Sequence, residues 1–269
     1  CVVVQDEEVV GEGWHERAGE AHAEIHALSV AGNRAKGAEV FVSLEPCAHT
    51  GRTGPCVTAL IEAGVKRVVA AMVDPNPQVA GKGLEMLNSA GIVAQVSQDD
   101  CGAAELNAGF CRRVVGGRPL VRLKVAATLD GRTAANDGSS KWITGDEARA
   151  DVHQLRASSC ALVTGIGTVR EDDPRLNARI DRQVVQPLRV VLDGNGQLDP
   201  EARLFSEPGD ILIVTSREDD EGFDFDARTE QICLAGADGR VDVAGVLELL
   251  AERSCNEVLV EAGAGVAGA

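Results

Sequence analysis

The N-terminal part of the chain holds a histidine, a glutamate and two cysteines in an order that suits metal chemistry. His22-Ala23-Glu24 precedes an apolar segment, Pro46-Cys47 follows another, and Cys56 comes nine residues after Cys47. One histidine and two thiolates are a reasonable ligand set for tetrahedral zinc, with water in the fourth position. Zinc would lower the pKa of that water toward neutrality. Glu24, two residues from His22, would then carry protons from the water to a leaving group.

These residues follow the pattern of the zinc nucleobase deaminases, in which H-x-E is combined with P-C-x-x-C. Here eight residues, not two, separate Cys47 from Cys56, and the inserted segment 48–55 is polar and rich in glycine. We interpret this insert as a substrate loop. A purely structural zinc domain is the alternative, but it would have four protein ligands and no shuttle carboxylate beside them.

Other residues of metal-binding type have a plainer interpretation. His26 lies one helical turn after His22, a spacing that also occurs in two-histidine metal sites. We interpret it as a packed or hydrogen-bonded histidine. The cysteines outside the predicted site are expected to be ordinary buried thiols; they are Cys1, Cys101, Cys111, Cys160, Cys233 and Cys255.

The second half carries polar motifs that follow predicted strands, where α/β sheets usually bind ligands. Gly165-Ile166-Gly167 begins a Rossmann fingerprint, but Arg170 stands in place of its third glycine, so a nicotinamide cofactor would need another fold. Arg156 and Arg179 are expected to hold a phosphate through forked hydrogen bonds. The glycines after Glu261 would let backbone N–H groups approach a pyrophosphate.

Strand and helix patterns alternate in both halves and predict two α/β domains. Gly116-Gly117-Arg118-Pro119 interrupts the pattern, so the predicted domains are 1–116 and 117–269. In the first, strands are expected at 2–4, 8–10, 39–44, 67–73 and 92–96, with helices at 21–31, 57–63, 84–90 and 103–113. In the second, strands are expected at 120–127, 161–164, 188–192, 211–215 and 257–260, with helices at 146–157 and 243–253.

Composition excludes several classes of function. The 269 residues carry a formal charge of −16 and only 3% aromatics, which disfavours a nucleic-acid-editing deaminase or an RNA-binding module. A small phosphorylated substrate remains compatible, because a few arginines can make a local positive pocket. No apolar run is long enough for a transmembrane helix, and eight scattered cysteines suggest reduced thiols in the cytoplasm. Both ends fall beside predicted strands, so we expect the chain to be a fragment.

The motifs in this order closely resemble the RibD family of bifunctional riboflavin-biosynthesis enzymes. The resemblance is carried by His22-Ala23-Glu24, by the segment 44–56 (LEPCAHTGRTGPC), by Asp74-Pro75-Asn76-Pro77 with Gly81-Lys82-Gly83, and by the second-half motifs around Trp142, Thr168, Asp172 and Glu261. It implies a cytidine-deaminase-like domain followed by a dihydrofolate-reductase-like domain, both truncated at their outer ends. It also implies Zn²⁺ and NADPH as cofactors, and self-association into a homo-oligomer.

The resemblance further implies a set of site residues. In the first half His22, Cys47 and Cys56 bind zinc, Glu24 is the proton shuttle, and the substrate contacts are His15, His49 and Arg52. In the second half the NADPH contacts are Ala126, Trp142, Thr168, Asp172, Gly194, Gly263, Ala264, Gly265, Val266, Ala267, Gly268 and Ala269. The substrate contacts there are Ser140, Arg156, Leu176, Arg179 and Glu261. From its place in the first predicted strand of this half, we also expect Lys124 to give polar support.

The activity implied is a pair of consecutive steps on one phosphorylated pyrimidine. Zinc-activated water would deaminate 2,5-diamino-6-ribosylamino-4(3H)-pyrimidinone 5′-phosphate, and NADPH would then reduce its ribosyl group to a ribityl chain. An alternative is deamination alone, with the second half acting as a degenerate binding domain.

Overall fold

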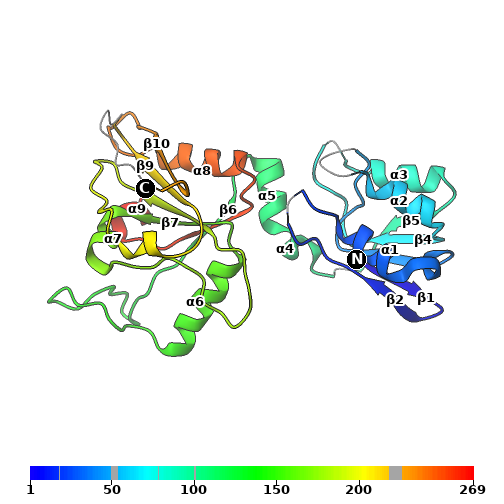
Figure 1. The fold of residues 1–269 in the computed structure, drawn as a ribbon, viewed down its shortest axis with the longest axis horizontal. Coiled ribbons are helices and arrows are strands. Elements are labelled where there is room, and N and C mark those ends of the chain that lie inside the picture. Colours follow the sequence, from blue (N-terminus) through cyan, green and yellow to red (C-terminus); the bar gives the residue numbers. More distant parts are fainter. Residues whose placement is uncertain (18, 50–53, 78, 100, 218–225) are drawn as a thin grey trace. The chain divides into compact units, whose positions relative to one another are not determined.

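The computed structural model describes residues 1–17, 19–49, 54–77, 79–99, 101–217 and 226–269. They form two compact units, Cys1–Val115 and Gly116–Ala269, each built around its own sheet (Figure 1). The first unit ends in two short helices, α4 (Ala103–Leu106) and α5 (Ala108–Gly116), rather than the single helix predicted. Asn107 lies between them, and its side-chain amide bonds back to the Ala103 carbonyl, a local bond that competes with a continuous helix.

The sheet of the first unit is mixed. Its strands are β1 (Val2–Gln5), β2 (Glu8–Glu12), β3 (Glu39–Val42), β4 (Arg67–Ala70) and β5 (Val93–Val96), in the order β2-β1-β3-β4-β5. The predicted hairpin of β1 and β2 is present, and Asp6 and Glu7 in its turn both have positive φ, as tight hairpin turns demand. Strands β3, β4 and β5 are parallel, so their carboxyl ends lie at one edge of the sheet.

Three helices pack against this sheet and bring their N-termini to the zinc motif. They are α1 (Ala23–Ala31), α2 (Cys56–Ala63) and α3 (Lys82–Ser89), and a short 3₁₀ helix, η1 (Gly32–Ala35), follows α1. Gly11 allows β2 to lie directly on α1, because a Cβ there would be 2.2 Å from the Ala27 carbonyl oxygen. Apolar side chains of sheet and helices form one core cluster, which includes Val3, Val40, Leu60, Val68 and Leu87.

The sheet of the second unit is parallel throughout. Its strands are β6 (Leu120–Leu123), β7 (Ala161–Gly165), β8 (Leu188–Leu192), β9 (Ile211–Thr215), β10 (Thr229–Cys233) and β11 (Glu257–Val260), in the order β10-β9-β8-β7-β11-β6. The chain crosses from β7 toward β8 on one side, while β11 and β6 lie on the other. Ligands bind outside the carboxyl ends of the strands at such a switch point.

Both faces of this parallel sheet are covered, as its continuous apolar runs predict. The helices are α6 (Asp146–Ser158), α7 (Ile166–Asp172), α8 (Val243–Glu252), α9 (Ala264–Ala267) and the 3₁₀ helix η2 (Arg203–Ser206). Val246 and Leu250 of α8 pack on one face of the sheet. Leu155 of α6 packs on the other face beside Leu162, where Val169 of α7 joins a further cluster.

Several expectations about single elements and residues were wrong. Strand β10 and helix α7 were not predicted; the sequence of β10 contains a single branched apolar residue, Ile232, because β10 is an edge strand. Of the cysteines predicted to be buried, Cys101, Cys160 and Cys233 are exposed and Cys1 and Cys111 are partly buried, and all eight cysteines are free thiols. In the part of the chain that the structure describes, we find no helix with the length and hydropathy needed to cross a membrane.

Candidate active sites

The structure brings the predicted zinc ligands together in the first unit. His22 is the N-cap residue of α1, Cys56 is the first residue of α2, and Cys47 lies in the loop after β3. The His22 Nδ1 atom is 3.2 Å from Cys56 Sγ and 3.5 Å from Cys47 Sγ. Tetrahedral zinc with ordinary Zn–N and Zn–S bonds would separate such atoms by roughly 3.6 Å. The two histidine–thiol separations are therefore within about 0.4 Å of those around a zinc ion, and three donors leave a fourth position for another ligand.

The two thiols are coupled to each other electrostatically. They share a hydrogen bond that lowers the pKa of Cys47 to about 5 and raises the pKa of Cys56, so that one thiol ionises readily while the other keeps its proton. The backbone N–H of Cys56, at the start of α2, also donates to Cys47 Sγ at 3.3 Å. A helix N-terminus favours negative charge, so α2 supports the thiolate form that a metal requires.

Glu24 lies in the first turn of α1 with only 6% of its surface exposed. Burial raises the pKa of its carboxyl group above the ordinary value, and its side chain is hydrogen-bonded to the Cys56 thiol. A buried carboxyl group beside the predicted metal ligands is placed for proton transfer. Glu24 is thus a neighbour of the donor set rather than a member of it.

The predicted substrate contacts of the first unit lie in different surroundings. His15 is exposed, and its ring packs edge-on against His22 at 5.2 Å between centroids. His49 is exposed in the loop after Cys47, whereas Arg52 lies outside the described residues. His26 is packed as predicted, but its Nε2 atom is buried without a hydrogen-bond partner in the structure, so the hydrogen-bonded interpretation fails at that atom.

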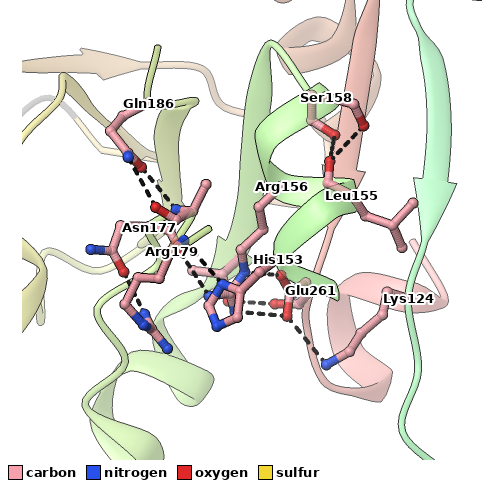
Figure 2. A network of polar contacts seen from close by, with 12 residues as sticks. Lys124, His153, Leu155, Arg156, Ser158, Asn177, Arg179, Gln186 and Glu261 are labelled. Carbon is pink, nitrogen blue, oxygen red and sulfur yellow. Dashed lines mark hydrogen bonds and ion pairs between the residues drawn. The ribbon is translucent and has the colours of Figure 1, made fainter. Parts of the chain in front are cut away.

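In the second unit, Glu261 forms the centre of a polar network at the carboxyl edge of the sheet (Figure 2). It follows β11 and is nearly buried, and it accepts hydrogen bonds from Arg156 of α6 and from Lys124 after β6. Burial alone would raise the pKa of Glu261, but Arg156 and Lys124 outweigh it and hold the pKa below its usual range. The network therefore holds a carboxylate whose charge is balanced by two cations.

Arg179 and His153 adjoin this network (Figure 2). Arg179 donates from its side chain to the Asn177 side-chain oxygen, and its backbone N–H donates to His153 Nδ1 at 3.3 Å. Burial, with Arg179 and Arg156 nearby, lowers the pKa of His153, so the imidazole is kept neutral. The Arg156 guanidinium is bonded to Glu261 rather than directed toward solvent. Of the two arginines predicted to hold a phosphate, Arg179 is therefore the exposed one. Neither His153 nor Asn177 belongs to a motif that sequence reasoning singled out.

Two of the remaining predicted substrate residues occupy contrasting positions. Ser140 is exposed in the stretch before α6. Leu176 is 2% exposed and has a positive φ of 53°, a conformation that is unusual for a leucine. It packs against Leu162 and Leu259, so its backbone is fixed beside Asn177.

A cavity of about 410 Å³ opens at the carboxyl ends of β7 and β8, beside the loop after β11. Four glycines expose their backbone in the wall of this cavity. A Cβ on Gly165 would be 2.8 Å from the Val266 side chain. Gly167, Gly263 and Gly265 have open space where a Cβ would be. Such a cradle fits a nucleotide cofactor, whose phosphates approach the backbone closely. Its lining residues are Gly165, Ile166, Gly167, Thr168, Glu171, Asp172, Leu192, Gly263, Ala264, Gly265 and Val266.

The other predicted NADPH contacts are not among these lining residues. Trp142 is largely exposed, with the Arg149 guanidinium 4.4 Å from its ring centroid. Its neighbour Lys141 reaches the cavity by pairing with Asp172 at 3.0 Å. Gly194 follows β8, and its carbonyl accepts from the Ser216 hydroxyl at 2.9 Å. Ala126 lies after β6, and Ala267, Gly268 and Ala269 end the chain at the last turn of α9.

Comparison with known proteins places both halves in one family. Residues 1–72 match the cytidine and deoxycytidylate deaminase zinc-binding region, and residues 119–269 match the RibD C-terminal domain. The whole chain aligns with the riboflavin biosynthesis protein RibD of Escherichia coli (strain K12), with 45% identity over 281 residues that cover 76% of that protein. The chain belongs to the RibD family. RibD of Haemophilus influenzae is 46% identical and is covered over 74% of its length.

Solved RibD structures have the same fold. Acinetobacter baumannii RibD matches 98% of this chain with a TM-score of 0.86 and 43% identity, over 74% of that structure. A protein from Thermotoga maritima, described as a diaminohydroxyphosphoribosylaminopyrimidine deaminase/5-amino-6-(5-phosphoribosylamino)uracil reductase, matches 98% of the chain with a TM-score of 0.85 and 36% identity, over 74% of its length. The expected arrangement, a cytidine-deaminase-like domain before a RibD reductase domain, is confirmed.

Proposed function

We propose that this chain catalyses two consecutive steps of riboflavin biosynthesis. The first is deamination of 2,5-diamino-6-ribosylamino-4(3H)-pyrimidinone 5′-phosphate, and the second is reduction of the ribosyl group to a ribityl chain with NADPH. The observation that carries the proposal is the three-ligand set of His22, Cys47 and Cys56 with Glu24 beside it, in a chain whose second half matches a RibD reductase domain. The named activities of the Thermotoga maritima relative support the same pair of reactions.

We assign deamination to residues 1–116 and reduction to residues 117–269. The zinc-binding match lies within the first range and the RibD C-terminal match lies within the second. The division between the compact units, after Val115, supports this assignment.

In the deaminase, the chain's own residues hold the reacting groups and move protons. Zinc, when bound by His22, Cys47 and Cys56, supplies the Lewis acidity that activates water for attack on the amine-bearing carbon. Glu24 accepts the proton that the water loses and returns it to the departing amine, which leaves as ammonia. Its buried place beside the three donor residues lets the same carboxyl group act as base and then as acid. His15, His49 and Arg52 bind the pyrimidine phosphate in this proposal.

In the reductase, the cavity beside Gly165 and Gly263 holds the cofactor and the network around Glu261 holds the substrate. NADPH, when bound, would supply the hydride for the ribosyl carbon next to nitrogen; the bond from that carbon to the ring oxygen breaks, and the oxygen takes a proton from solvent to become a ribityl hydroxyl. Arg179 is the exposed cation that faces outward from the network, so we assign it to the substrate phosphate. Ser140, Leu176 and Arg156 complete the proposed substrate contacts. The proposed NADPH contacts are those given by the resemblance, with Thr168, Asp172 and the 263–266 turn at the cavity wall.

We also infer that the protein works in the cytoplasm as a homo-oligomer. Eight free cysteines favour a reducing compartment. Self-association rests on the family resemblance, and light scattering after size-exclusion chromatography tests it: a mass near twice that of the chain or greater is expected, and a monomer mass would contradict it.

The product mass after incubation of zinc-loaded protein with the diaminopyrimidinone ribosyl phosphate and NADPH tests the proposed function. Exchange of the amine for oxygen together with a gain of two hydrogens is expected. Exchange alone would show deamination without reduction and favour a degenerate second half. An unchanged substrate would contradict both assignments for this chain.

A further inference from the structure

We propose that Glu45 is a positioning residue of the deaminase, whose buried carboxylate holds the segment 74–84, described at 74–77 and 79–84, against the loop that carries Cys47. The inference rests on the deaminase activity proposed above. It concerns a residue that is not part of the donor cluster or of the proposed proton path, and that acts through the backbone of a distant segment.

The carboxylate of Glu45 accepts four backbone hydrogen bonds from that segment. Oε2 accepts from the N–H groups of Asp74 at 3.1 Å and Gly81 at 2.9 Å. Oε1 accepts from the N–H groups of Gly83 at 2.8 Å and Leu84 at 3.3 Å. Glu45 is only 3% exposed, so solvent does not compete for these bonds. A buried carboxylate needs such donors to offset its lost hydration.

Two of these donors belong to the first turn of α3, whose N-terminal N–H groups have no partner within the helix. The N-cap residue is Gly81, which has no side chain to accept from them. Glu45, 38 residues earlier than Gly83 in the sequence, does so instead. Because a helix N-terminus attracts negative charge, the carboxylate fixes both the start and the direction of α3.

The contact between the two segments leaves no room for adjustment. A Cβ on Gly83 would lie 2.1 Å from the carbonyl oxygen of Pro46 and 3.1 Å from Glu45 Oε1. Pro46 immediately precedes the zinc ligand Cys47. Gly83 is therefore packed directly on the backbone that presents the proposed metal ligand, and the Glu45 carboxylate accepts the hydrogen bonds that hold this contact together.

The segment held in this way brings further polar groups to the deaminase site. Asp74 is 7% exposed and accepts from the Asn76 N–H at 2.8 Å, which shapes the turn of the Asp-Pro-Asn-Pro motif. Asp74 also lies within electrostatic range of both Cys47 and His49. A shift of the segment would move these groups relative to the proposed substrate contact His49 while leaving the metal ligands on their own elements. We therefore expect Glu45 to control substrate binding more than zinc content.

The test compares Glu45→Gln with Glu39→Gln in the full chain. A glutamine offers one acceptor oxygen and one NH₂ group, so two of the four N–H groups would face a donor. Glu39 is a matched control, because it lies in β3 of the same unit and, among the described residues, pairs with the partly exposed Lys66 and Arg67. We expect kcat/KM for deamination to fall about tenfold or more in Glu45→Gln, mainly through KM, since small misplacements of binding groups are costly. Zinc content and the cobalt-substituted absorption spectrum should match the wild type.

A second pair of variants reaches the same contact without changing a charge at Glu45. Gly83→Ala pushes the segment away from Pro46, while Glu85→Ala alters an exposed residue of the same helix. Gly83→Ala should show the same rise in KM with zinc retained, and Glu85→Ala should behave as the wild type. If Glu45→Gln loses zinc because its unit does not fold, the KM and zinc content of Gly83→Ala test the inference instead.

The outcomes separate this inference from the proposed function. Deamination constants within twofold of the wild type in both Glu45→Gln and Gly83→Ala would overturn the inference, even if both variants melt at lower temperature. A fall in kcat at unchanged KM, accompanied by an altered cobalt spectrum, would overturn it too, because Glu45 would then act on the metal loop. If neither wild type nor Glu39→Gln deaminates, the proposed function itself is wrong.

Discussion

Arg156 and Glu261, 105 residues apart in the sequence, form a two-pronged ion pair in the second unit. Arg156 Nε donates to Glu261 Oε1 at 2.6 Å, and Nη2 donates to Oε2 at 3.1 Å. The side chains are 12% and 9% exposed. Removal of one member of a buried pair leaves an uncompensated charge, which costs more than the pair itself contributes.

Arg156→Met should therefore lower the unfolding free energy of the second unit by about 3 kcal/mol near neutral pH. Burial raises the pKa of Glu261, and Arg156 and Lys124 lower it. In the variant Lys124 is the remaining cation of this pair, so the pKa of Glu261 rises. In the wild type the depressed pKa stabilises the fold above the pKa of an unfolded glutamate, about 4.3, and this contribution is lost as the pH falls through the folded pKa. The difference in unfolding free energy between the wild type and Arg156→Met should therefore become smaller as the pH is lowered. Urea denaturation at several pH values, followed by hydrogen exchange in residues 116–269, measures this difference in unfolding free energy. A difference that stays the same at every pH would contradict the prediction.

Glu24→Gln should reduce deamination by about a hundredfold or more, because positioned acid–base groups contribute 10² to 10⁴. Bound zinc should be unchanged, since Glu24 is outside the donor set. Reduction of the deaminated pyrimidine by the same protein should continue. Glu20→Gln, an exposed residue before α1, serves as control. Loss of metal in Glu24→Gln, measured by elemental analysis, would make Glu24 a ligand instead of the proton carrier.

Removal of zinc by a chelator should abolish deamination and spare reduction. Within the described residues, the donor cluster found is that of His22, Cys47 and Cys56, and all three lie in the first unit. Cys47→Ser should reproduce the effect by weakening metal binding. Deamination followed by mass, and reduction followed by NADPH absorbance with pre-deaminated substrate, separate the two activities. Equal loss of both on chelation would contradict the division of labour proposed here.

Arg189→Met should lower the unfolding free energy of the second unit by about 3 kcal/mol. Arg189 is 1% exposed in β8, and its guanidinium donates to the carbonyl oxygens of Leu204, Glu207 and Gly209. Burial lowers the pKa of this arginine, yet three carbonyls keep the cation in place. Arg182→Met, at an exposed position, is the control. A melting temperature equal to that of the control would show that the three carbonyls find other partners.

The sequence by itself determined the chemistry of the zinc site and the position of most elements. His22, Glu24, Cys47 and Cys56 could be predicted as ligands and shuttle because such roles depend on residue type and local spacing, and the three predicted donors do lie together. Strands such as β8 and β9 were predicted because short apolar runs are characteristic of buried parallel strands. Their boundaries followed from the turn residues that flank them.

Only the tertiary structure decided which distant groups meet. The pattern of strands and helices in the sequence does not indicate that Arg189 is buried or that the Arg156 guanidinium pairs with Glu261. It also does not indicate that Glu45 accepts four backbone hydrogen bonds from the segment 74–84. Each contact depends on strand order and on the register with which elements pack, and these are properties of the whole fold. Local pattern specifies which residues can do chemistry, whereas long-range packing specifies which partners hold them.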